Sequence, residues 1–267
     1  MFRTLGLLAL APTLWAQNLN SEQPCNPAVG EAVAAHLHID PAALAERAVY
    51  AACKANPENR EETLTAWAIL GEGYTTENYR DSQEDMPEWQ LLVARIRDGR
   101  VQEAFSSREF IDATTDIGTL TLDTAPYRLN PQTRAFGVHF FSIATPSRYA
   151  EYVLKNDMHL FATVNGKLRP LVSFGTTPWM NYTLNATREK CPQCTSQSAG
   201  SFIIIVNKDS QHHGFADLSV KAQLDGSDDD GREYKLGRET VILRYDGSRH
   251  QLVTKKWWLV SPLLLNP

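Results

Sequence analysis

Hydrophobic and polar positions follow two different patterns along this chain. Residues 42–55 are rich in Ala, Leu, Glu, Arg and Lys, as helices are. They follow Asp40 and Pro41, an N-cap residue with proline at the first helical position. We therefore expect a helix over residues 42–55, preceded by a shorter one around residues 28–37.

From residue 62 onward, apolar residues alternate with polar ones or form short runs between turn dipeptides, as in β-strands. Three hairpins are predicted, because Asp-Gly and Asn-Gly pairs adopt the positive backbone angles of a type I′ turn. The pairs are Asp98-Gly99, Asn165-Gly166 and Asp246-Gly247. Further strands are expected at residues 64–70, 119–122, 134–143, 201–206 and 215–221.

About a dozen strands without intervening helices predict a mainly β fold. We expect a large antiparallel body of hairpins, either propeller-like or a sandwich, with a small N-terminal helical segment. The predicted organisation has three parts: a signal peptide over 1–16, the helical segment over 17–60 and a β-rich domain over 61–267.

The first of these parts has the pattern of an export signal. Arg3 is followed by an apolar stretch over residues 5–14, and the small Ala16 stands before a polar run. This order is typical of a secretory signal peptide, and the stretch is shorter than the about 20 residues that a membrane-spanning helix needs. We expect an exported protein, periplasmic or extracellular, that is cleaved after Ala16.

The four cysteines agree with export, because an even number in an exported chain predicts disulfides. The simplest pairing joins Cys25 to Cys53 and Cys191 to Cys194. The alternative pairing ties the N-terminal segment to the β body. The Cys-Pro-x-Cys spacing of the second pair also resembles a redox site, but loop residues surround it, and we favour structural disulfides.

Composition excludes several classes of function. The net charge is −5, with 43% hydrophobic and 21% charged residues, which is an ordinary globular balance without the basic surface that nucleic acid requires. After residue 16, no apolar segment is long enough to predict a membrane span. The standard sequence signatures of catalytic nucleophiles are also missing from the chain.

Residues 209–220, Asp-Ser-Gln-His-His-Gly-Phe-Ala-Asp-Leu-Ser-Val, form the densest group of chemically active side chains. The segment resembles the calcium-loop strand of FG-GAP-type β-propeller repeats, with Asp209 at the first ligand position, Gly214 at the turn and Asp217 at the strand entry. Together with the ending Tyr-Asp-Gly at 245–247, it is similar to exported bacterial proteins of unknown function. Gln211 and His213 stand where that family has carboxylates, so we expect no calcium and no other cofactor.

Apart from this resemblance, the same residues suggest a binding site. His212 and His213 are candidates for metal ligands or for an acid/base pair with Asp217, although adjacent residues on a strand point to opposite faces. Trp179 and Tyr182 lie in predicted loops, and exposed aromatic residues commonly anchor interfaces.

The leading hypothesis is an exported, non-catalytic binding protein of the cell envelope, such as an inhibitor or immunity-type protein, whose partner is another envelope or secreted protein. Its candidate binding residues are Asp209, His212, His213, Asp217, Trp179 and Tyr182. One alternative is a hydrolase of envelope polymer or peptide, with a site built from the 209–217 loop and an acidic loop over residues 72–85. Another alternative is a structural, propeller-like module.

Overall fold

The structure is a computed structural model. It describes residues 23–79, 88–110, 115–144, 155–176, 191–194, 196–198, 201–254 and 260–262. The expected signal peptide lies outside the described residues, so its prediction stays untested by the structure.

Two short helices open the described part of the chain. The side chain of Asn26 accepts a hydrogen bond from the backbone of Val29 and caps α1 (Pro27–Leu37). In the same way Asp40 accepts from the backbone of Ala42 and caps α2 (Pro41–Arg47). Each helix has proline at its first position, where a missing N–H costs nothing.

The helix expected over residues 42–55 is wrong beyond Arg47. The following residues form β1 (Ala48–Asn56), which pairs antiparallel with β2 (Asn59–Leu70), so the boundary expected at residue 60 falls inside a hairpin. Ala51 is fully buried with the helices and Ala52 is fully buried on the opposite face. Packing on both faces of the strand therefore outweighs the weak helix preference of alanine.

The described strands form three antiparallel sheets. The first sheet has the order β1-β2-β3-β4, with β3 (Glu88–Arg97) and β4 (Arg100–Phe110). The middle sheet has the order β14-β8-β7-β6-β5, made of Val260–Pro262, Lys167–Thr176, Lys155–Val164, Arg134–Ala144 and Thr115–Arg128.

The third sheet has the order β10-β11-β12-β13, made of Phe202–His212, Phe215–Ser227, Glu233–Tyr245 and His250–Leu252. The short β9 (Ser196–Ser198) also pairs with the end of β11. The three sheets and the two short helices confirm the mainly β prediction and the small helical segment.

All three predicted hairpins are confirmed, between β3 and β4, β7 and β8, and β12 and β13. At the first two turns both residues have positive φ, as the Asp-Gly and Asn-Gly pairs predict. At the third turn Tyr245 pairs with His250, so the loop has four residues, and only its glycine, Gly247, has positive φ.

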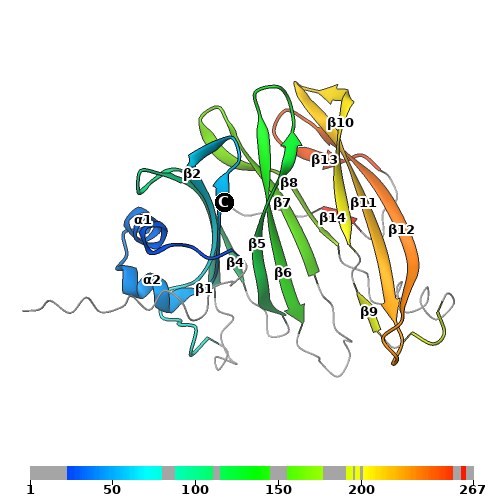
Figure 1. The fold of residues 1–267 in the computed structure, drawn as a ribbon, viewed down its shortest axis with the longest axis horizontal. Helices are drawn as coiled ribbons and strands as arrows, with labels where there is room; N and C mark the ends of the chain where they lie inside the picture. Colours follow the sequence, from blue (N-terminus) through cyan, green and yellow to red (C-terminus); the bar gives the residue numbers. More distant parts are fainter. Residues whose placement is uncertain are drawn as a thin grey trace, which may run out of the picture.

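The three sheets are stacked face to face, and the two helices cover the outer face of the first sheet (Figure 1). Trp89 of the first sheet stacks on Phe140 of the middle sheet, with ring centroids 4.8 Å apart, in the core between them. Phe174 of the middle sheet packs with Leu218 of the third sheet in a second core. The outer face of the third sheet is therefore the one sheet face that no other layer of described residues covers.

Both disulfides follow the simplest predicted pairing. Cys25, just before α1, is bonded to Cys53 in β1 with an S–S distance of 2.00 Å. Cys191 is bonded to Cys194 at 2.01 Å and lies buried at the core between the middle and third sheets. No described cysteine is free.

Candidate functional site

The strand register defines the side chains on the outer face of the third sheet. In β11, Leu218 and Val220 point into the core, so Ser219 between them points outward. Ser219 lies opposite Ile205 of β10 on one side and Ile242 of β12 on the other. The row continues to Val253, whose backbone N–H donates to the carbonyl of Ile242 at 3.0 Å.

This face holds all the exposed large hydrophobic side chains of the described residues. Ile203 is 58% exposed, Ile205 37% and Val253 43%. We call Ile203, Ile205, Ile242 and Val253 the aliphatic patch. Single exposed aliphatic residues are common on protein surfaces, but several of them gathered on one uncovered face are typical of an interaction surface.

Beside the patch, β10 is interrupted by a bulge. Asn207 pairs with Asp217 and Gln211 with Ala216, so residues 208–210 of β10 have no paired residue in β11. The bulge borders an open groove of about 610 Å³ between β10 and β12. Such bulges re-aim side chains, and this one turns Ser210 back toward the sheet.

The buried carboxylate of Asp217 lies at the centre of this groove and is only 2% exposed. Nδ1 of His212 lies 2.8 Å from Oδ1, and the Ser210 hydroxyl donates to Oδ2 at 2.8 Å. Arg244 lies 3.6 Å from Oδ2. Burial acts to raise the pKa of Asp217, but the bonds from Ser210 and His212 and the nearby positive charge keep this pKa below its ordinary value of 3.8.

This arrangement determines the hydrogen bonding of the histidine. An ionised carboxylate only accepts hydrogen bonds, so Nδ1 of His212 carries the proton in the bond to Asp217. A histidine oriented in this way is able to act as a base through Nε2. However, Ser210 donates to Asp217 and not to His212, so its hydroxyl is not activated as a nucleophile is in a hydrolase triad.

The structure brings together some of the candidate binding residues. His212 and Asp217 form a pair, and Asp209 lies exposed in the neighbouring bulge. His213 stands in the two-residue turn between β10 and β11 with φ 48°, and its ring lies next to Gly247 of the β12–β13 turn. Trp179 and Tyr182 lie outside the described residues.

Sequence reasoning missed several members of the site. Ser210 and Arg244 both contact Asp217, and Ile242 completes the aliphatic patch from β12. The uninterrupted apolar run at residues 202–206 indicates a strand with two apolar faces, but it does not indicate which of the two is exposed. Nothing in the local sequence marks Arg244, since it reaches the site only through the pairing of β11 with β12.

Within the described residues, no group of three or more His, Cys, Asp or Glu side chains is placed to hold a metal ion. Asp209 and His213, which match ligand positions of the calcium-loop pattern, are separated by the bulge and the end of β10. The resemblance to FG-GAP repeats therefore stays a prediction.

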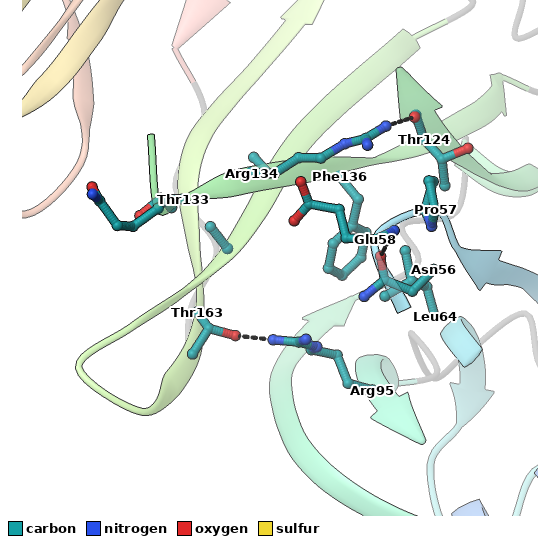
Figure 2. A pocket seen from close by; sticks show the side chains of 13 residues that line it. Asn56, Pro57, Glu58, Leu64, Arg95, Thr124, Thr133, Arg134, Phe136 and Thr163 are labelled. Carbon is teal, nitrogen blue, oxygen red and sulfur yellow. Dashed lines mark hydrogen bonds between the residues drawn. The ribbon is translucent and has the colours of Figure 1, made fainter. Parts of the chain in front are cut away.

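A second hollow, of about 140 Å³, lies between the first and middle sheets (Figure 2). Its charged groups are already paired. Arg95 binds Glu62 through two hydrogen bonds and donates to Thr163 at 2.5 Å, and Glu58 pairs with Arg128. We infer that these charged groups hold the first and middle sheets together.

The described part of the acidic loop expected to complement the 209–217 segment, residues 72–79, lies in another part of the molecule. Glu72 follows β2 of the first sheet, whereas Asp217 lies on the outer face of the third, and the middle sheet stands between these sheets (Figure 1). Residues 80–85 of that loop, with Asp81, Glu84 and Asp85, lie outside the described residues. The described part of the loop, residues 72–79, is not brought to the 209–217 segment.

Comparisons with models of protein families, with curated proteins and with solved structures found no match for this chain. Among the described helices, none combines the length and apolar character that crossing a membrane requires.

Proposed function

We propose that this chain is an exported, non-catalytic binding protein that recognises another envelope or secreted protein through the outer face of its third sheet. The observation that carries the proposal is the aliphatic patch, because every exposed large hydrophobic side chain of the described residues belongs to it. Burying such side chains on a partner releases about 25 cal/mol for each Å² removed from water.

The two disulfides support the exported location, because such bonds persist in oxidising compartments. The bulge beside the patch supports specificity. Lys208 and Asp209 in the bulge and Arg244 in β12 border one side of the aliphatic patch with polar groups, as part of an interface rim does.

The hydrolase alternative has weaker support. It requires a nucleophile hydrogen-bonded to the base, but the hydroxyl of Ser210 donates to Asp217, as described above. It also requires the acidic loop, whose described residues 72–79 follow the first sheet and are separated from the third sheet by the middle one (Figure 1). We therefore assign the His212–Asp217 pair to positioning within the recognition surface.

Site-specific photocrosslinking in the producing cell tests this function. A photoreactive residue at position 205 or 253 should give a discrete adduct, whereas one at the exposed Glu31 of α1 should give none. The crosslinked partner, purified separately, should bind the protein in calorimetry, and Ile205→Lys should weaken that binding by about tenfold or more. Equal adducts from positions 205 and 31 would contradict the proposed surface.

A further inference from the structure

We propose that β10 is a docking edge, to which an acidic, extended segment of the partner adds as a further strand of the third sheet. This inference rests on the proposed function, since it names the binding mode and the partner chemistry for the same face. It follows from a comparison of the sheet edges and from the charges around β10.

The edges of the first and middle sheets are protected. The side chain of Gln23 accepts from the backbone N of Leu122 at 2.7 Å and donates to its carbonyl at 3.0 Å, which occupies part of the β5 edge. The carbonyl of Gln23 accepts from the N–H of Cys53 at 3.0 Å on β1. The β4 edge carries several charged residues, Arg100, Glu103 and Arg108, and charges of this kind discourage strand addition.

Two other edges are only partly covered. β13 and β14 have three residues each and pair only with Leu243–Tyr245 of β12 and Phe174–Thr176 of β8. The rest of the β12 edge carries the charged Glu233, Lys235 and Arg238, and Pro170 interrupts the rest of the β8 edge. Charges and proline of this kind discourage strand addition. Of the edge strands in the described chain, β10 is the one with a stretch, residues 202–206, that is free of all these protections. This stretch holds no charge and no proline, whereas Lys208, Asp209 and the bulge protect the part of β10 that follows.

The first part of β10 has the composition of a strand that accepts another. Residues 202–206 are Phe-Ile-Ile-Ile-Val, and they pair one for one with β11 without a charge or a bulge. Aromatic and β-branched residues favour extended structure, and an uncharged edge of this kind is a template for strand addition. The bulge that begins at Lys208 ends this template.

The charges near the edge indicate the chemistry of the added segment. Lys221 lies opposite Ile203 in the register, and Lys208 and Arg244 flank the other side of the patch. All three cations are exposed, whereas among the described residues of these rows and the bulge the one exposed anion is Asp209. The carboxylate of Asp217 is buried and engaged by its three partners.

Three cations against the exposed Asp209 and the buried Asp217 leave this surface positive overall, in a chain with a net charge of −5. A second copy of the chain would bring the same cations against these, whereas an acidic partner gains attraction and faster association. Alternation along a strand places every second side chain on the patch. The partner segment should therefore carry aliphatic residues at alternate positions, with carboxylates at its ends.

Fluorescence anisotropy with synthetic peptides tests the inference on the oxidised, purified protein. The probe is a peptide of about ten residues, with Ile at alternate central positions, Thr between them and Glu at both ends. One control peptide replaces each Glu by Lys, and a second replaces a central Thr by Pro. The acidic peptide should bind, the Lys peptide about tenfold more weakly, and the Pro peptide more weakly still.

Charge reversal provides the matched variant. The double substitution Lys208→Glu and Lys221→Glu should invert the preference, so that the Lys peptide binds better than the Glu peptide. Both positions are exposed, so the variant should keep the wild-type melting temperature. Hydrogen exchange should show that the acidic peptide protects backbone amides within residues 202–206.

Four outcomes would overturn the inference. These are equal binding of the Glu and Lys peptides, binding without protection of β10, protection in the isolated monomer of the β10 amides that point away from β11, and a concentration-dependent dimer that protects those same amides. If the crosslinking experiment at position 205 succeeds while all the peptides fail, the docking mode is wrong and the proposed function stands. If crosslinking itself fails, the proposed function is wrong.

Discussion

Nδ1 of His212 and Oδ1 of Asp217 lie 2.8 Å apart across the end of the β10–β11 hairpin, and the carboxylate is almost completely buried while the imidazole is partly exposed. The pair therefore connects a histidine at the surface to a buried negative charge in the third sheet. A buried carboxylate is tolerated only because hydrogen bonds replace its contacts with water. One of these bonds comes from Ser210 in the bulge, so the need to satisfy Asp217 holds the bulge in place.

Asp217→Asn tests this interpretation. The amide keeps the shape of the side chain but loses the charge and cannot accept at both terminal atoms, so the free energy of unfolding should fall by about 2 kcal/mol. Asp209→Asn, in the exposed part of the bulge, should change it by less than about 0.5 kcal/mol. Urea titration of both variants provides the measurement, and equal effects would contradict the structural role of Asp217.

The lowered pKa of Asp217 also predicts a limit in acid. Its ionised form is preferred in the folded protein, so its stabilising contribution is complete above the ordinary value of 3.8 and is lost as the pH falls further. In the Asp217→Asn variant, unfolding should depend less steeply on pH below about 4 than in the wild type. Identical slopes would show that Asp217 does not titrate differently in the two states.

The lowered pKa of His159 predicts a second pH dependence of the stability, at higher pH than that of Asp217. Burial, aided by the charge of His139, lowers the pKa of His159 from 6.5 to about 4. The neutral form is favoured in the folded state, so the full stability is present above pH 6.5 and is lost as the pH falls toward 4. The loss should reach about 3 kcal/mol.

Denaturant titrations from pH 7 to pH 4 measure this loss. His159→Gln keeps a group able to hydrogen-bond with Ser173 but cannot titrate, so its stability should vary less over this range. His36→Gln, on the exposed surface of α1, should keep the wild-type dependence. A His159→Gln protein with the full wild-type slope would refute the assignment.

Arg95 and Glu62 should be strongly coupled in stability. Glu62 is 1% exposed and is bonded to Arg95. Arg95 in turn donates to Thr163 of the middle sheet, a bond that Figure 2 shows. Arg95→Met leaves a buried carboxylate without its cation and should lower the free energy of unfolding by about 3 kcal/mol or more. The double variant Arg95→Met and Glu62→Leu should recover most of this loss, and additive effects in the double-mutant cycle would contradict the coupling.

The two disulfides should contribute unequally. Cys25–Cys53 closes a loop with a sequence separation of 28 and should stabilise the fold by about 3 kcal/mol, mainly by restricting the unfolded chain. Cys191–Cys194 closes a loop with a separation of 3 and should contribute less. Thermal unfolding of the two double Cys→Ser variants measures the difference, and a larger loss from the second pair would contradict this order.

Export can be tested at the N-terminus of the secreted product. Cleavage after Ala16 should leave Gln17 as the first residue, which N-terminal sequencing identifies. A product that begins at Met1 would contradict the predicted signal peptide.

Local sequence alone predicted most of the β-strands and the cysteine pairing. The Asp-Gly and Asn-Gly pairs act within a few residues, so they are readable without the rest of the fold. The His212–Asp217 pair was accessible for the same reason, because its members are five residues apart on one hairpin. The helix prediction failed over Ala48–Asn56 because burial between the helices and the first core decided the conformation of those alanines.

Only the tertiary structure decided which side of β10 is exposed. The run Phe-Ile-Ile-Ile-Val at 202–206 is apolar at every position, so alternation cannot distinguish an inner from an outer face. Stacking on the middle sheet buries Phe202 and Ile204 in part and leaves Ile203 and Ile205 outward. Arg244 and Ile242 join the site through the register of β12, a long-range pairing that no local pattern in the sequence encodes.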